Sequence, residues 1–162
     1  MKTGKILSGI SGEYFVAGEL SRNGYVAALT LRNNADSDII TTTSDGTKSF
    51  NIQVKTKRKD KSSVWQMGSH PLETSSKWDN NFYYVFVSIS DGLADNYVDY
   101  YIIPKNIANK TIEDKHQLWL SGKKKSGEAR KSQVRTLGMN TIPNFEDYKN
   151  EKGWEKLKNN IQ

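Results

Sequence analysis

At 162 residues, 35% of them hydrophobic, the chain is the size of one domain with a sizeable core, and its net charge of +6 favours a polyanionic partner. The lack of cysteine excludes disulfides, zinc–thiolate sites and a thiol nucleophile, and His70 and His116 cannot form a metal cluster by themselves. No apolar run approaches the roughly 20 residues of a membrane span, and the N-terminus lacks the apolar stretch of a signal peptide, so we expect a cytoplasmic protein without a membrane partner.

The first half of the chain has the pattern of one helix followed by three strands. A helix opens at residues 11–13 and stops at Asn23 and Gly24, with apolar residues at helical spacing between them. A β run covers residues 25–31. Two further β runs, at 38–43 and 49–55, flank an Asp-Gly pair that is typical of tight hairpin turns.

The second half adds the centre of the sheet. Residues 82–89 are the most apolar run of the chain, and their aromatic and β-branched content predicts a central strand buried on both faces. The order of elements predicts an α/β fold, a mixed central sheet flanked by helices, in a single domain spanning 1–162. The other predicted elements are strands at 64–67 and 97–103, short helices around 107–108 and 114–120, a basic loop at 123–135 and an amphipathic helix at 145–157.

The predicted hairpin brings chemistry together at one sheet edge. It sets Asp38 opposite Gln53, Val54 and Lys55. Side chains two apart on a strand share a face, so Gln53 and Lys55 point one way and Val54 the other. Mg²⁺ prefers oxygen ligands and keeps several waters, so a carboxylate, an amide oxygen and an ammonium here predict a site for cutting a phosphodiester.

These motifs occur in an order that resembles the PD-(D/E)XK nuclease superfamily, which has the restriction-endonuclease-like fold. That family has a helix bearing a Glu, a strand meander carrying an Asp, and an acidic-X-Lys motif. Here Glu13 lies in the helix, Asp38 in the meander, and residues 53–56 read Gln-Val-Lys-Thr. The chain looks especially like an uncharacterised bacterial subgroup with this Gln-Val-Lys-Thr variant. The resemblance covers most of the chain, because it extends to Trp65, residues 83–87 and residues 116–120.

The resemblance implies a role for each motif residue. Asp38 would be the central metal ligand, with the backbone carbonyl of Val54 as a further ligand. Gln53 replaces the usual acid, so its amide oxygen would bind the metal more weakly. Lys55 would activate the attacking water and stabilise phosphate charge, and Glu13 would reach the same metal directly or through water. The implied cofactor is Mg²⁺ or Mn²⁺, as one or two ions.

Each of these residues also has a purely structural explanation. Lys55 can be a solvated charge at a strand edge, Asp38 a turn residue, and Glu13 a carboxylate favoured by the helix dipole. The apolar residues directly after Asp38 argue against a simple turn there. Asp36 and Glu19 are the neighbouring acids that could be mistaken for site residues.

Two basic clusters are candidates for contacts with nucleic-acid phosphates. Such contacts supply salt-dependent affinity without reading sequence, and the alternative is that each cluster is a solvated loop. The expected nucleic-acid-binding residues are Lys57, Arg58 and Lys59 in the first cluster, and Lys123, Lys124, Lys125, Arg130 and Lys131 in the second.

Three aromatic side chains complete the expectations. His116 and Trp119 lie three apart on a predicted helix, with Trp119 expected in the core and His116 in a structural hydrogen bond or a phosphate contact. Trp65 is expected to be partly exposed near the site.

The leading hypothesis is a Mg²⁺-dependent nuclease that hydrolyses DNA phosphodiesters through a metal-activated water. A homodimer is expected because cutting both strands needs two sites. One alternative is a catalytically silent nucleic-acid-binding or protein-interaction module on the same fold, because Gln53 replaces the usual acid. Another is an immunity-type factor whose basic face binds an acidic protein.

Overall fold

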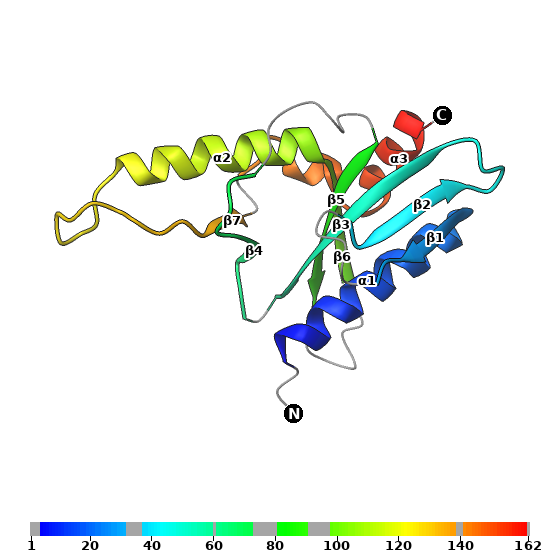
Figure 1. Cartoon of the computed structure of the whole chain (residues 1–162), viewed down its shortest axis with the longest axis horizontal. Helices are drawn as coiled ribbons and strands as arrows, with labels where there is room; N and C mark the ends of the chain where they lie inside the picture. Colours follow the sequence, from blue (N-terminus) through cyan, green and yellow to red (C-terminus); the bar gives the residue numbers. More distant parts are fainter. Residues whose placement is uncertain are drawn as a thin grey trace.

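A mixed five-stranded sheet forms the centre of the computed structural model, which describes residues 4–31, 37–59, 61–72, 81–90, 98–138 and 141–161 (Figure 1). Its strand order is β1-β2-β3-β5-β6, and only β3 and β5 run parallel. The mixed sheet with flanking helices confirms the predicted fold class. The strands are β1 (Tyr25–Leu29), β2 (Ile39–Thr43), β3 (Ser49–Arg58), β5 (Phe82–Ile89) and β6 (Val98–Pro104).

The two central strands carry the burial pattern that their sequences predict. Seven of the eight residues of β5 are buried, because both faces of this strand are covered. In β3 the side chains alternate, and Phe50, Ile52 and Val54 are buried on one face. The hairpin of β2 and β3 is confirmed, with Gly46 of its turn at a φ of 70°.

One face of the sheet is covered by α1 (Lys5–Arg22) and α3 (Asn150–Ile161). Val16 and Leu20 of α1 and Leu157 of α3 are buried in the same apolar cluster as the β3 side chains named above. At Gly12, α1 approaches β3 so closely that a Cβ would overlap the Thr56 hydroxyl. This close approach fixes where the first helix crosses the strand.

The other face is covered by α2 (Lys105–Ser121), the 3-10 helix η2 (Phe145–Tyr148) and a two-stranded sheet. The small sheet pairs β4 (Val64–Gly68) with β7 (Arg135–Gly138). Trp65 is 0% exposed at the centre of this second core, and its Nε1 donates to the Val87 carbonyl at 2.8 Å. The expectation of a partly exposed Trp65 was therefore wrong: the indole finds its polar partner inside.

The helices differ from their predicted bounds for local reasons. Helix α1 begins at Lys5, so Ser11, which was expected at its start, lies inside the helix and donates its hydroxyl to the Leu7 carbonyl. The two short helices expected around 107–108 and 114–120 are one helix, α2, in which the Lys110–Asp114 ion pair spans the expected break.

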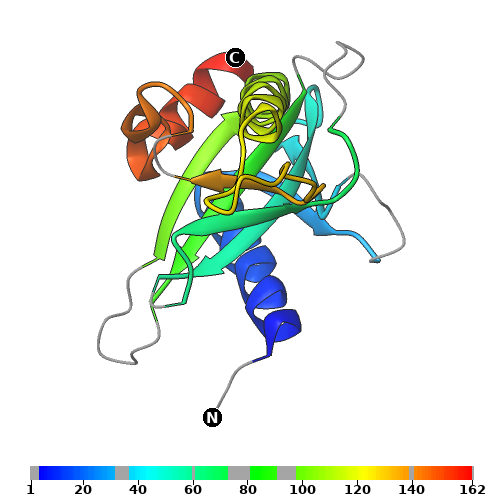
Figure 2. The same cartoon turned by 90° about the vertical axis from the view of Figure 1, so that its left-hand side faces the viewer.

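The end of α2 and the segment after it project from the sheet as an arm, defined here as residues 112–134 (Figure 1). In Figure 2 this arm points toward the viewer. Trp119 lies on the arm and is 41% exposed, so the expectation of a core position for it was wrong. The reason is that α2 extends beyond the edge of the sheet on which it packs (Figure 1). No helix among the described residues is long and apolar enough to cross a membrane.

Candidate active site

Asp38 lies at the fork where β2 and β3 part. The ladder between the two strands ends with Ile39 opposite Ile52, and the Asp38 N–H donates to the Ile52 carbonyl at 2.8 Å. Asp38 Oδ2 accepts a hydrogen bond from the Val54 N–H at 2.7 Å. The Asp38 carboxylate thus accepts the Val54 N–H bond that a carbonyl of the neighbouring strand would otherwise accept. The two bonds hold Asp38 beside residues 53–55.

The backbone of Val54 faces the same fork. Within an extended strand the N–H and C=O of one residue point to the same side. Because the Val54 N–H points to Asp38, its carbonyl oxygen is also directed toward the fork and away from β5, which lies on the opposite side of β3. Two oxygen donors, one from a side chain and one from the backbone, are therefore aimed at the same place.

Gln53 and Lys55 flank this point on one face of β3, and both are half-buried. Burial lowers the pKa of the Lys55 ammonium from its usual 10.5, and the nearby Asp38 carboxylate opposes that shift without cancelling it. A lysine with a lowered pKa gives up its proton more readily, so this amine can act as a base or orient a water.

Glu13 stands on α1, across the sheet from Gln53 and Lys55. Its neighbour Gly12 touches Thr56 of β3, one residue beyond Lys55, and the Glu13 side chain is half-buried. Glu13 therefore lies near the end of β3 that carries Lys55, but on the α1-facing side of the strand, the side to which Val54 and Thr56 point.

The oxygens at the fork match a divalent-cation site with few protein ligands. They are the Asp38 carboxylate and the Val54 carbonyl, and the Gln53 amide belongs to the preceding residue of β3, which points to the same face as Lys55. Across the described ranges, no group of three or more His, Cys, Asp or Glu side chains is placed to hold a metal. An all-oxygen set with one carboxylate fits Mg²⁺ whose remaining ligands are waters and substrate phosphate.

The first predicted basic cluster is largely engaged within the protein. Lys57 Nζ lies 4.2 Å from the centre of the Trp65 ring, a cation–π contact. Burial, and then the neighbouring Lys59, lower the pKa of Lys57, against the opposing effect of Asp99. Lys59 itself is 2.7 Å from Asp99 Oδ2. Arg58 lies between them on β3 and is half-buried.

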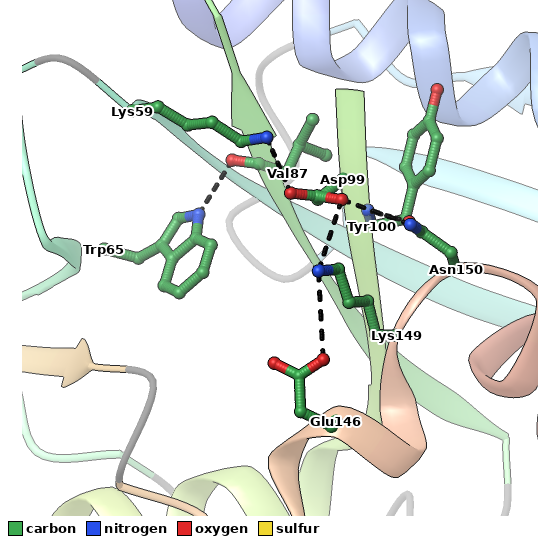
Figure 3. A network of polar contacts seen from close by, with 8 residues as sticks. All are labelled: Lys59, Trp65, Val87, Asp99, Tyr100, Glu146, Lys149 and Asn150. Atoms are coloured by element: carbon green, nitrogen blue, oxygen red, sulfur yellow. Dashed lines mark hydrogen bonds and ion pairs between the residues drawn. The ribbon is translucent and has the colours of Figure 1, made fainter. Parts of the chain in front are cut away.

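Asp99 is the buried centre of a polar network that sequence reasoning missed (Figure 3). Besides Lys59, its carboxylate accepts a hydrogen bond from Asn150 Nδ2 at 3.1 Å and faces Lys149 Nζ at 3.7 Å. The Asn150 Oδ1 in turn accepts from the Tyr100 N–H at 2.8 Å. The network ties the end of β3 to β6 and α3.

The second basic cluster lies on the arm. The loop turns back on itself through Gly127, whose φ is 84°, and an isolated bridge between Lys123 and Ala129 closes it. Lys124 forms an exposed ion pair with Glu128 at 2.9 Å, which contributes little stability. Along the arm the cations face solvent or are only half-buried; they are Lys123, Lys124, Lys125, Arg130 and Lys131.

Arg135, at the end of the same basic stretch, has a different role. It is 3% exposed and forms an ion pair with Glu113 of α2. Glu113 also accepts a hydrogen bond from the Leu72 N–H at 2.6 Å, and Arg135 donates to the Ser69 carbonyl at 3.1 Å. The buried pair holds β7 against α2. Because the partners are 22 residues apart, no local sequence pattern reveals it.

The fold is shared with a nuclease of known structure. A bacterial homing endonuclease, I-Ssp6803I, matches with a TM-score of 0.53 over 97% of this chain and 95% of its own, at 12% identity. No family model matches the chain, and no curated protein matches its sequence. At this identity the likeness establishes the α/β arrangement alone.

Proposed function

We propose that this protein is a divalent-metal-dependent nuclease that hydrolyses phosphodiester bonds in DNA. The observation that carries the proposal is the bond from the Val54 N–H to Asp38 Oδ2, which holds a carboxylate at the start of the Gln53–Lys55 segment. The fold shared with a protein named as a homing endonuclease supports the same conclusion.

Three oxygens would hold the cation: the Asp38 carboxylate, the Gln53 amide and the Val54 carbonyl. Bound there, Mg²⁺ or Mn²⁺ supplies a lowered pKa for water and neutralises phosphate charge. With Gln53 in place of an acid, the site has one negative charge fewer, so its affinity for the metal ion depends more on the substrate phosphate. Binding of the ion should therefore be much tighter with DNA present than without it.

We assign Lys55 as the general base that activates the attacking water. Its lowered pKa lets the amine accept the proton of the attacking water as the new P–O bond forms and the bond to the leaving sugar oxygen breaks. The departing oxygen takes a proton from solvent. After proton transfer the Lys55 ammonium stabilises negative charge on the phosphate. Glu13 lies on the other face of the sheet, so we propose that it would act on the metal through a bridging water and not as a direct ligand.

Contacts to DNA would come from the arm more than from β3. The exposed cations at 123–131 are available to phosphates, whereas Lys57 and Lys59 already have aromatic and acidic partners inside the protein. We further propose that two copies act together, because one site cuts one strand. Sedimentation of the protein with and without duplex DNA tests this point.

The test is cleavage of supercoiled plasmid with Mg²⁺ or Mn²⁺, by wild type and by Asp38→Ala and Lys55→Ala. Lys152→Ala is the matched control, since it removes an exposed cation on α3. We expect nicked and linear products from wild type and the control, and a rate at least about a hundredfold lower from the two site variants. Equal rates in all four proteins would overturn the assignment.

A catalytically silent DNA-binding protein on the same fold is the second candidate. It is favoured by Gln53 and by the lack of a three-residue acid or histidine cluster among the described residues. It predicts salt-dependent binding that neither metal nor Asp38→Asn changes. A metal-dependent rise in affinity that Asp38→Asn abolishes would instead support the nuclease.

A further inference from the structure

A groove on the arm has the chemistry of a nucleotide site, at a place separate from the β2–β3 fork. It lies between α2 and the chain that returns to β7, and its volume is about 440 Å³, within the range of small-molecule sites. Its lining includes aromatic, hydroxyl-bearing and cationic side chains, among them Lys115, His116, Trp119, Ser132, Thr136 and Thr141.

Trp119 offers an aromatic surface in this groove. Its indole is 41% exposed, although the His116 ring stacks on it with an interplanar angle of 16° and a centroid distance of 5.9 Å. The Arg130 guanidinium lies over the Trp119 ring, 5.1 Å from its centre, as a cation–π contact, and its Nη1 donates to the Trp119 carbonyl at 3.1 Å. A base that stacks on this face would displace the guanidinium from the ring. A large aromatic group that stays exposed among fixed neighbours is a surface on which a further ring can stack.

His116 supplies an independent sign of a ligand. The side chain is 7% exposed, and its Nε2 has no hydrogen-bond partner among the described residues. A buried polar atom without a partner costs stability, so such an atom beside a groove is expected to serve a ligand. An exocyclic amine, a ring nitrogen or a sugar hydroxyl of a nucleotide could make that bond.

The charge around the groove favours a nucleotide over an apolar protein segment. Lys115 lines it, Arg130 lies against the lining residue Trp119, and the exposed Lys131 directly precedes the lining residue Ser132. Ser132, Thr136 and Thr141 add hydroxyls that can bond to a base edge. A flat aromatic wall, hydroxyls and surrounding cations are together the features by which proteins hold an unstacked base and its phosphate.

We infer that the arm groove binds one unpaired nucleotide of a nucleic-acid strand, with its base stacked on Trp119 and its phosphate beside Arg130 and Lys131. This inference rests on the proposed function for its partner, nucleic acid. It adds that the preferred substrate contains a bulged, flipped or single-stranded nucleotide. Fully paired DNA would leave the groove empty.

The test compares two labelled duplexes that differ only by one extra, unpaired adenine in one strand. Affinities are measured in EDTA at a fixed salt concentration, so that no cleavage occurs, and a second probe carries 2-aminopurine as the extra base. The variants are Trp119→Ala, Trp119→Phe and Thr136→Ala. Leu118→Ala is the matched control, because Leu118 is 74% exposed on the same helix and is not part of the groove.

We expect wild type and Leu118→Ala to bind the bulged duplex about tenfold more tightly than the paired one, and to quench the 2-aminopurine. Trp119→Ala should bind both duplexes equally, Trp119→Phe should retain part of the preference, and Thr136→Ala should reduce it. Equal affinity of wild type for both duplexes, or a preference that Trp119→Ala leaves intact, would overturn the inference.

The design separates this inference from the nuclease proposal. A preference for the bulge in a protein that cleaves nothing with any divalent metal supports the groove and contradicts the proposed catalysis. Metal-dependent cleavage that Asp38→Ala abolishes, without any preference for the bulge, supports the catalysis and contradicts the groove.

Discussion

Substitution of Gly12 by Ala tests how closely α1 must approach β3. In a solvent-exposed helix this change stabilises by about 1 kcal/mol, because Ala has the higher helix propensity. At Gly12 the added Cβ would overlap the Thr56 hydroxyl and lie 3.1 and 3.2 Å from Thr56 Cβ and Cγ2. Thr56 is β-branched and fixed in a central strand, so it cannot rotate away.

The magnitude follows from the opposing effects. Overpacking costs about 1–3 kcal/mol, and the depth of this overlap places Gly12→Ala near the upper value. Subtracting the gain in helix propensity leaves a net loss of about 2 kcal/mol, or about 4–8 °C in Tm for a chain of this size. Gly18→Ala is the matched control: it lies in the same helix with nothing within 4 Å, and its Tm should rise.

The assay is thermal unfolding of the single variants and of the double variant with Thr56→Ala. The Thr56 hydroxyl is buried, and no hydrogen-bond partner for it lies among the described residues, so its removal costs little by itself. The double variant should regain most of the stability that Gly12→Ala loses. A Gly12→Ala protein as stable as Gly18→Ala, or losses that simply add in the double variant, would refute the close-packing argument.

Three further predictions follow from the described contacts. Arg135→Ala should lower the free energy of unfolding by about 3–5 kcal/mol in urea titrations, because it leaves the Glu113 carboxylate in a largely buried place without its partner. Burial raises the pKa of Glu113, but the hydrogen bonds from Arg135 and from the Leu72 N–H outweigh this effect, so the net pKa is lowered. The stability contributed by the pair is therefore full above pH 4.5 and is lost as the pH falls through the lowered pKa. The Glu113→Gln protein should lack this loss. The cleavage rate should rise as the pH increases through the lowered pKa of Lys55, because the amine must lose its proton before it can act as the base, and a pH–rate profile that Lys55→Ala leaves unchanged would contradict this role. On the arm, the slope of log affinity against log salt should fall by about 0.9 for each phosphate-contacting cation changed to Ala, an effect absent if the cluster is only a solvated loop; the first three to test are Lys123, Lys124 and Lys125.

Local patterns predicted the elements whose form depends on near neighbours. The Asp-Gly turn predicted the hairpin, and the continuous apolar run predicted the buried β5, because both signals lie within a few residues. The position of Asp38 beside Gln53–Lys55 follows from the hairpin alone. The catalytic roles of these residues remain a prediction that activity has to test.

Contacts between distant segments could not be read in the same way. Lys59 and Asp99 look like ordinary surface charges in the sequence, yet they pair across the sheet through a carboxylate that is buried. Trp119 has helical spacing consistent with a core position, and its exposure depends on where α2 runs past the sheet. Such outcomes depend on tertiary placement, which periodicity does not encode.

The most direct test of the proposed site is a crystal soaked in Mn²⁺, with the anomalous signal used to locate the ion. The assignment predicts a peak at the β2–β3 fork, coordinated by the Asp38 carboxylate and the Val54 carbonyl, with Gln53 adjacent and the peak absent in Asp38→Ala. Manganese bound only elsewhere, or a peak at the fork that survives Asp38→Ala, would contradict it.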